Sequence, residues 1–349
     1  MNAMATLNVP RMAATTLLFI ASFLLLSLRP TEAQVGVSYG KIANNLPSPR
    51  DVVNLYRSNN IKAMRLYFPD QQTLQALQGT DIKLMIGVAN ENIRSIASCR
   101  CAAYRWVRAN VLPYRSSISY IVVGNEVDPS SQPGSSVAPA MQNIQYALDV
   151  LNINNQNDEI KVSTAINANL ITNSYPPSNG QFKDPSYIAP IIDFMNNHDS
   201  PLLVNVYPYF AYANDPKDIS LDYALFTSPG YVFTDPNNGL RYQNLYDAMV
   251  DSVYAALRRA GGHHHRRVIA SESGWPSNGG FGATLENAKT YTRNLINHAK
   301  QGTPLTPGQP IETYVFAMFD ENEKQGPETE RNFGLFHPNQ QPKYGYLGF

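Results

Sequence analysis

The sequence predicts a single-domain α/β protein with a (β/α)8 TIM-barrel fold. Eight short runs are continuously apolar rather than alternating, which is typical of strands buried on both faces of a parallel sheet. Segments with apolar positions three and four residues apart separate these runs, as expected for helices. The 349 residues are enough for one such barrel. A doubly wound open sheet is the competing fold, and the number of strands favours the barrel.

The elements follow in order along the chain. Strands are expected at 35–39, 63–67, 83–88, 120–124, 161–166, 202–206, 267–271 and 313–319. Helices are expected at 51–59, 102–111, 137–151, 188–197, 245–260 and 285–300. Gly261 and Gly262 end one helix, and Gly302 with Pro304 ends another. The long stretch between the sixth and seventh strands is rich in Tyr, Pro, Asn and Gly, so we expect an elaborated loop on the active face.

A removable leader precedes the first strand. Arg11 provides a positive flank, an apolar run of twelve occupies 17–28, and Ala33 supplies a small residue for cleavage. This order is typical of a secretory signal peptide, so we expect residues 1–33 to be removed and 34–349 to form the barrel domain. An uncleaved signal anchor is the alternative. Thr15, Thr16 and Ser22 weaken it, and we expect no membrane association after cleavage.

The charge balance argues against several classes of partner. The chain has 27 basic and 27 acidic side chains, and residues 1–33 hold Arg11, Arg29 and Glu32, which leaves 25 basic and 26 acidic ones. A net charge near −1 offers no electrostatic reason to bind nucleic acid or anionic lipid. The abundance of Tyr, Asn and Pro suits neutral, hydroxyl-rich ligands, and we expect a monomer.

The cysteine and histidine residues do not indicate a disulfide framework or a metal site. Cys99 and Cys101 are the only cysteines, and a single intervening residue rarely permits disulfide geometry, so no covalent bridge is expected. The run 263–267 (HHHRR) follows two glycines and precedes a strand, which indicates an exposed loop rather than a metal site. We expect neither a metal nor a cofactor.

Two carboxylates occupy the positions where barrel enzymes carry their chemistry. Glu126 follows the fourth expected strand and Glu272 the seventh, and active sites form at the carboxyl ends of barrel strands. Glycoside hydrolysis needs two such groups, because one protonates the leaving oxygen while the other attacks the anomeric carbon or activates water. Taken singly, either residue is equally well explained as a structural acid at a strand end.

Several motifs at these strand ends carry a resemblance that covers nearly the whole of 34–349. The segment 268–277 (VIASESGWPS) contains Glu272, and 123–127 (VGNEV) contains Glu126. Further motifs are VGVSYG, NNLP, MRLY, NVYPY, FAMFDEN and FGLF. Together they resemble glycoside hydrolase family 17, the plant-type β-1,3-glucanases, which belong to the retaining glycosidases built on this barrel.

The resemblance implies a role for each matching residue. Glu272 is implied to be the nucleophile and Glu126 the general acid/base, with anomeric configuration retained and the two carboxyl groups about 5–5.5 Å apart. The following residues are implied to support or line the site: Glu321, Lys324 and Glu330 as a charged cluster, Asn125 toward the sugar 2-hydroxyl, Tyr207 toward Glu272, and Tyr39, Phe210, Trp275 and Phe319 along the sugar cleft. A surface salt bridge is the alternative for Lys324 and Glu330, and core packing is the alternative for each cleft aromatic.

We expect a secreted enzyme that hydrolyses internal bonds of β-1,3-glucan. Its biological role would be either defence against fungal walls or turnover of callose. Segments 208–212 and 238–242 favour the β-1,3-glucanase branch over hydrolysis of mixed-linkage β-1,3;1,4-glucan. A non-catalytic glucan-binding wall protein is a further alternative, and the presence of both Glu126 and Glu272 argues against it. The expected signal peptide directs the protein to the extracellular space, that is, the apoplast. The vacuole is the alternative destination.

Overall fold

A computed structural model describes residues 35–154, 159–263 and 267–349, which belong to one compact unit. The expected signal peptide, residues 1–33, and the middle of the histidine-rich run at 263–267 lie outside the described residues.

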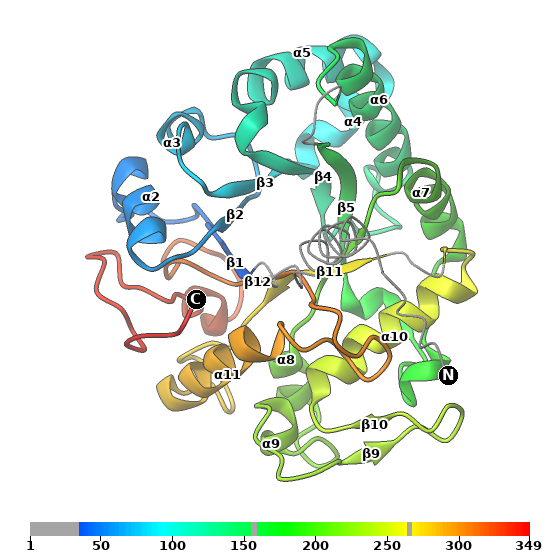
Figure 1. Ribbon diagram of the computed structural model, residues 1–349, viewed down its shortest axis with the longest axis vertical. Coiled ribbons are helices and arrows are strands. Elements are labelled where there is room, and N and C mark those ends of the chain that lie inside the picture. The colour runs from blue at the N-terminus through cyan, green and yellow to red at the C-terminus, as the bar shows by residue number, and fades with distance from the viewer. Residues whose placement is uncertain (1–34, 155–158, 264–266) are drawn as a thin grey trace, which may run out of the picture. The chain divides into compact units, whose positions relative to one another are not determined.

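Eight parallel strands close into a barrel, which confirms the predicted fold (Figure 1). The order around the ring is β1-β12-β11-β8-β5-β4-β3-β2, and every neighbouring pair is parallel. The strands are β1 (Val35–Ser38), β2 (Ala63–Leu66), β3 (Lys83–Val88), β4 (Ile118–Asn125), β5 (Lys161–Asn167), β8 (Leu202–Asn205), β11 (Val268–Ser273) and β12 (Thr313–Val315).

The last barrel strand is shorter than expected. A strand was predicted over 313–319, but β12 ends at Val315. Beyond it the backbone bonds to other partners: the amide of Ala317 donates to the carbonyl of Phe333, and the amide of Met318 donates to that of Ser38. Phe316 still donates its amide to the carbonyl of Ser273 in β11, and Ser38 belongs to β1, so the regular ladder ends gradually, and the C-terminal segment supplies the partner only at Ala317.

Helices surround the barrel (Figure 1). The six predicted helices are present as α2 (Pro49–Ser58), α5 (Arg100–Asn110), α6 (Val137–Val150), α7 (Pro185–His198), α10 (Leu245–Arg259) and α11 (Leu285–His298). Two short ones, α3 (Gln71–Leu77) and α4 (Ile93–Ser98), were not predicted. Side-chain caps set several starts: Ser48 caps α2, Asn244 caps α10 and Thr284 caps α11.

The long connection after β8 is more ordered than the expected loop. It holds α8 (Pro208–Asn214), α9 (Leu221–Ala224) and an antiparallel pair of strands, β9 (Phe233–Thr234) and β10 (Arg241–Tyr242). Pro208 stands at the first helical position of α8, where its fixed φ and missing N–H are tolerated. A second small hairpin pairs β6 (Ile171–Thr172) with β7 (Gln181–Phe182) after β5.

The barrel strands are apolar throughout because both of their faces are buried. One cluster fills the barrel interior and includes Met85, Leu203 and Tyr314. A larger cluster packs the outer strand faces against the helices, with Ile121 and Val204 from the strands meeting side chains such as Ile144. This two-sided burial explains the continuous apolar runs.

The expectation that Cys99 and Cys101 stay unbridged was wrong. The two form a disulfide with a Cα–Cα distance of 5.1 Å, within the range that disulfides require. Cys99 is the extended residue immediately before α5 (φ −148°, ψ 120°), whereas Cys101 lies in the first turn of the helix. The change of backbone direction at this helix start brings the two side chains together despite the single intervening residue.

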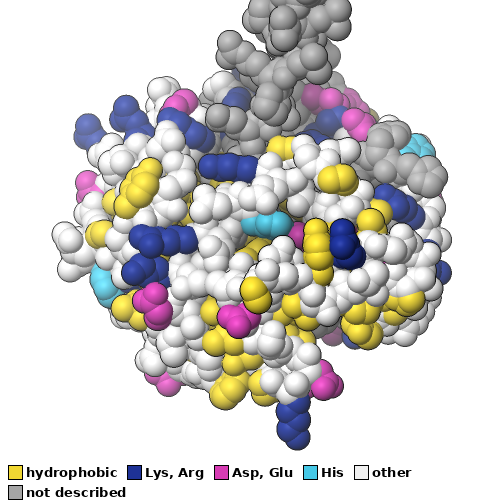
Figure 2. Space-filling view, turned by 60° about the horizontal axis from the view of Figure 1, so that its bottom comes forward, with side chains coloured by type: hydrophobic (Ala, Val, Ile, Leu, Met, Phe, Trp, Pro, Cys, Tyr) yellow, Lys and Arg dark blue, Asp and Glu magenta, His cyan; other side chains and the backbone are white. Residues whose placement is uncertain are grey.

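The surface fits the balanced charge of the sequence. On the face drawn in Figure 2, charged side chains of both signs are spread out, with large uncharged areas between them. Within the ranges that the structure describes, no helix is both long and apolar enough to cross a membrane.

Candidate active site

The end of β4 directs Glu126 into a cavity at the carboxyl end of the barrel. Gly124 has φ +76°, and a Cβ there would lie 2.6 Å from Val127 and 2.7 Å from Ile93, so only glycine fits. Glu126 itself has φ +49°, a left-handed conformation that costs a non-glycine residue free energy. Such strain is found where the surrounding structure dictates the direction of a functional side chain.

Three donors hold the carboxyl group of Glu272 at the end of β11. Nη1 of Arg65 donates to its Oε1 over 2.9 Å, and the hydroxyl of Tyr67 donates to the same oxygen over 2.7 Å. The hydroxyl of Tyr207 donates to Oε2 over 2.7 Å. Burial, followed by the charge of Glu272, raises the pKa of both tyrosines well above the usual value, so both remain hydroxyl donors. The carboxyl group of Glu272 therefore has a fixed orientation.

Arg65 ties the ends of several strands together. It lies on β2, is only 1% exposed, and donates to the carbonyl of Ser271 over 2.7 Å and to Oδ1 of Asn125 over 2.7 Å, besides its bond to Glu272. Its guanidinium also lies 4.7 Å from the ring centre of Tyr67. A buried guanidinium is tolerated when it is paired and its donors are used, and here both conditions hold.

Asn205, at the end of β8, connects the two carboxylates. Its Nδ2 donates to Oε1 of Glu126 over 2.9 Å and to Oδ1 of Asn125 over 3.1 Å. Its Oδ1 accepts from Arg65 over 3.2 Å and from the hydroxyl of Ser271 over 2.8 Å. One continuous hydrogen-bond network therefore runs from Glu126 through Asn205 and Arg65 to Glu272.

Both carboxylates line one cavity of about 570 Å3, a size typical of small-molecule sites. Its polar wall includes Asn125, Asn167 and Asn205. Phe210 and Phe333 form an aromatic wall that also contains Tyr207, with ring centres 5.4 and 5.8 Å from that of Tyr207. Amide groups beside aromatic faces suit a sugar, which offers hydroxyls at its edge and C–H groups on its faces.

The electrostatic surroundings of Glu126 favour its protonated form. Desolvation in the cavity and the negative charge of Glu272 raise the pKa of Glu126 above its usual value, while hydrogen bonds from Asn205 and Asn167 oppose the shift. A carboxyl group with a raised pKa can act as a proton donor near neutral pH.

The charged cluster expected beside the site is assembled. Nζ of Lys324 lies 3.0 Å from Glu330 and 4.0 Å from Glu321, and 4.3 Å from the ring centre of Phe316. Lys324 and Glu330 line the cavity, whereas Glu321 lies behind it, 3% exposed, and accepts from the amide of Ile42. Burial raises the pKa of Glu321, and Lys324 opposes that shift.

Three of the aromatics that were expected along the cleft lie in the core instead. Tyr39 and Phe319 are 1% and 2% exposed and pack edge to face. Trp275, 1% exposed, donates from its indole nitrogen to the carbonyl of Gly282 and packs against Tyr209. None of the three lines the cavity, because their rings fill the space between strand ends and covering loops. Asn125, Tyr207 and Phe210 do line it.

Sequence reasoning did not single out Arg65, Tyr67, Asn205 or Phe333. Arg65 offered a usable indication: an arginine inside a strand expected to be buried on both faces requires a buried partner. Tyr67, Asn205 and Phe333 lie in motifs quoted above, but nothing in their local pattern distinguishes them from packing residues. Within the ranges described, no group of three or more His, Cys, Asp or Glu side chains is arranged to hold a metal ion.

A (β/α)8 barrel with two glutamates in one sugar-sized cavity, one directly after β4 and one near the end of β11, has the architecture of a glycoside hydrolase. Residues 35–346 match the family model "Glycosyl hydrolases family 17". The chain belongs to this family and is a glycoside hydrolase.

Similar proteins cover almost the full chain. A "Glucan endo-1,3-beta-glucosidase" of Vitis vinifera is 50% identical over 333 residues, 93% of this chain and 95% of that protein. The "Glucan endo-1,3-beta-glucosidase, basic vacuolar isoform GLB" of Nicotiana tabacum is 49% identical, covering 97% and 91%. The solved structure of "CJP38, a beta-1,3-glucanase and allergen of Cryptomeria japonica pollen" is 45% identical, with a TM-score of 0.85 over 90% of this chain and 98% of that one.

Proposed function

We propose that this glycoside hydrolase cleaves internal β-1,3-glucosidic bonds of β-1,3-glucan with retention of configuration, acting as a monomer without a cofactor. The observation that carries the proposal is the shared cavity, in which Glu126 and Glu272 are joined through Asn205 and Arg65. The activities named for the similar proteins of Vitis vinifera, Nicotiana tabacum and Cryptomeria japonica support the linkage.

In the first step Glu272 attacks the anomeric carbon. The bond from that carbon to the glycosidic oxygen breaks, and Glu126 donates its proton to the departing oxygen. The sugar is then bonded to a carboxylate oxygen of Glu272, and Glu126 is left ionised. The raised pKa of Glu126 supports the donor role, and the orientation that Tyr67, Tyr207 and Arg65 impose on Glu272 supports the role of nucleophile.

In the second step the same groups exchange tasks. Glu126 takes a proton from a water molecule, the water oxygen attacks the anomeric carbon, and the bond to Glu272 breaks. Two inversions at one carbon restore the starting configuration. Asn125 is the amide next to the proton donor in the cavity wall, and we assign it to the sugar 2-hydroxyl.

The linkage and the stereochemistry are tested together by product analysis. A soluble β-1,3-linked hexasaccharide should be cleaved internally, and NMR should show the β-anomer of the new reducing end before mutarotation. A mixed-linkage β-1,3;1,4-glucan should be cleaved much more slowly. Cleavage confined to the mixed-linkage polymer contradicts the proposed linkage, and an initial α-anomer contradicts retention.

The role of Glu272 is tested with a matched pair of variants. Glu272→Gln should lower kcat by several orders of magnitude, because an amide oxygen is a poor nucleophile. Glu312→Gln is the control: Glu312 also accepts from two tyrosine hydroxyls, those of Tyr120 and Tyr314, but it precedes β12 at the opposite end of the barrel. Its kcat should stay near that of the parent, and equal kcat values for the two variants would exclude the mechanism.

We further propose that residues 1–33 are removed and that the domain from 34 onward is released into the secretory route. The apoplast is the destination that the leader supports, and the vacuolar isoform from tobacco indicates the other. A mature protein isolated from its source should begin at Gln34 when its N-terminus is sequenced. A mature N-terminus that still contains the apolar run 17–28 contradicts cleavage.

A further inference from the structure

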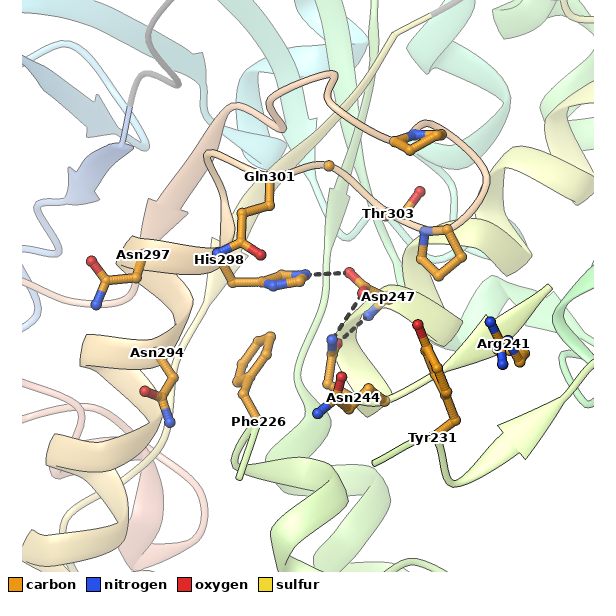
Figure 3. A pocket seen from close by; sticks show the side chains of 14 residues that line it. Phe226, Tyr231, Arg241, Asn244, Asp247, Asn294, Asn297, His298, Gln301 and Thr303 are labelled. Carbon is orange, nitrogen blue, oxygen red and sulfur yellow. Dashed lines mark hydrogen bonds and ion pairs between the residues drawn. The ribbon is translucent and has the colours of Figure 1, made fainter. Parts of the chain in front are cut away.

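A second cavity, of about 450 Å3, opens on the flank of the barrel (Figure 3). Its walls come from the N-terminal turn of α10, the C-terminal half of α11, the segment 301–307 before β12, and the chain around the β9–β10 hairpin. None of its lining residues lines the catalytic cavity. We call it the flank cavity.

Helix α10 separates the two cavities. Asp247 faces the flank cavity, and Met249 lines the catalytic one. Two residues along an α-helix correspond to a turn of about 200°, so these side chains point to nearly opposite sides of α10. A ligand in the flank cavity is therefore held outside the catalytic cavity, on the other side of α10.

The floor of the flank cavity is a built polar network. Nε2 of His298 lies 2.6 Å from Oδ1 of Asp247, and Nδ2 of Asn244 donates to the other oxygen of Asp247 over 2.8 Å. In Figure 3, a dashed line joins His298 on α11 to Asp247 on α10. Asp247 is only 4% exposed, so the network is fixed before any ligand arrives.

The rim of the flank cavity offers both hydrogen-bond donors and hydrogen-bond acceptors. Asn297 and Gln301 are exposed, and their side-chain amides make no hydrogen bond with the part of the chain that the structure describes. An amide both donates and accepts, as a sugar hydroxyl does. Two carboxamides beside an open hollow thus match a ligand with several neighbouring hydroxyls.

Aromatic rings complete the lining. Tyr231 is 58% exposed at the mouth, where the guanidinium of Arg241 lies 4.3 Å from its ring centre and holds the ring in place. Phe226 lies deeper, with its ring centre 5.1 Å from that of His298. Phe226 has φ +63°, which is an outlier for a bulky residue and marks a backbone held against its preference, as happens at ligand sites.

We propose that the flank cavity is a second binding site for a neutral β-glucan chain, distinct from the catalytic cavity. The proposal rests on the proposed function, which supplies the class of ligand. The ionisable side chains of the lining are already partnered, because Asp247 is hydrogen-bonded by His298 and Asn244, and Arg241 lies over the face of Tyr231. What remains for a ligand is an exposed ring and amides, which recognise an uncharged, hydroxyl-rich chain.

A second binding site of this kind should increase the rate of hydrolysis of a polymeric glucan but not of a short oligosaccharide. It holds a long or insoluble glucan near the enzyme and raises the local concentration of chain at the catalytic cavity. A hexasaccharide gains nothing from being held outside the cleft. The two substrates therefore separate this role from a direct effect on catalysis.

The experiment compares Tyr231→Ala, Gln301→Ala and the double variant with the parent. Retention on insoluble linear β-1,3-glucan is measured in a Glu272→Gln background, in which turnover does not consume the matrix. Loss of one aromatic contact should weaken retention about threefold to tenfold. In active enzyme, kcat/KM on the soluble β-1,3-hexasaccharide should stay within twofold of the parent. Tyr346→Ala is the matched control, because Tyr346 is 79% exposed and lies outside the flank cavity.

Four results distinguish the possibilities. Weaker retention with unchanged hexasaccharide cleavage, in the flank variants but not in Tyr346→Ala, supports the second site. Parent-like retention in the double variant overturns it, and so does an equal loss on polymer and hexasaccharide, because the effect would then act through the catalytic cavity. If the parent itself cleaves neither β-1,3-linked substrate, it is the proposed function that fails.

Discussion

Backbone conformation at individual residues aims the catalytic carboxyl group. Gly124 and Glu126 both have positive φ, and Asn125 between them donates its backbone amide to Oδ1 of Asn90 over 2.8 Å. The hydrophobic periodicity of the sequence does not indicate these positive φ angles. The only local indication is the glycine two residues before the glutamate. The strand end could therefore be predicted, whereas the direction of Glu126 required the structure.

The hydroxyl of Tyr207 is expected to act on catalysis through Glu272. Tyr207→Phe removes one hydrogen bond to a charged group, about 1.5–3 kcal/mol, so kcat should fall roughly tenfold to a hundredfold. KM for the hexasaccharide should change little, because the ring that lines the cavity remains. Tyr246→Phe is the control: its buried hydroxyl bonds Thr313 far from the carboxylates, and its kcat should match the parent. A kcat for Tyr207→Phe equal to that of this control would remove Tyr207 from the mechanism.

The pH dependence of kcat/KM should reflect the pKa of Glu126. Activity needs this carboxyl protonated in the first step, so the rate falls as pH rises through its pKa, which lies above the usual value. The amide of Asn205 donates to the carboxylate and lowers that pKa. Asn205→Ala removes the bond, raises the pKa of Glu126, and should move the alkaline limb of kcat/KM to higher pH.

Asn169 provides the comparison for this shift. It lines the same cavity but makes no contact that alters the titration of Glu126. Asn169→Ala should leave the alkaline limb unmoved. A shift of the limb to lower pH in Asn205→Ala would show that another group controls it.

At the scale of elements, prediction succeeded where local pattern and burial agree. The strand β3 was placed at its observed bounds, because the run after Lys83 is apolar and buried to its end at Val88. The helix α8 was missed because its tyrosines and proline are typical of loops, whereas in the structure its Phe210 packs against Phe333 of the C-terminal segment. The end of β12 was misplaced for the converse reason: its apolar residues continue, but their partners change.

The disulfide at the start of α5 should stabilise the protein only modestly. Its closed loop is very short, and loop-closure entropy grows with loop length, so its removal should cost about 1–2 kcal/mol. The double variant Cys99→Ser/Cys101→Ala breaks the bond, while the introduced serine keeps an oxygen at the helix cap. Thermal unfolding of the parent with and without reductant should show the same small decrease, and the double variant should no longer respond to reductant. A parent Tm that reductant leaves unchanged would mean that the disulfide contributes nothing.

At the scale of the whole molecule, barrel closure brings the site together. In the ring order, β2 and β8 are four strands apart in either direction, so Arg65 and Asn205 start from opposite sides of the barrel and meet in its interior. Strand counting predicted that Glu126 and Glu272 share one face. It did not predict the side chains that connect them, since those contacts depend on the ring order and on which residue of each strand points inward.

The cross-barrel pair of Arg65 and Glu272 should couple stability to the catalytic carboxylate. Both groups are buried, at 1% and 6% exposure. Arg65→Met leaves Glu272 without its charged partner and should lower the free energy of unfolding by about 3–5 kcal/mol. Adding Glu272→Gln removes the uncompensated charge, so the double variant should be more stable than Arg65→Met alone. Lys62→Met is the control, because it breaks the exposed pair with Asp81 and should leave the denaturation midpoint unchanged. Additive losses in the double variant would show that Arg65 stabilises the barrel through its other contacts and not through Glu272.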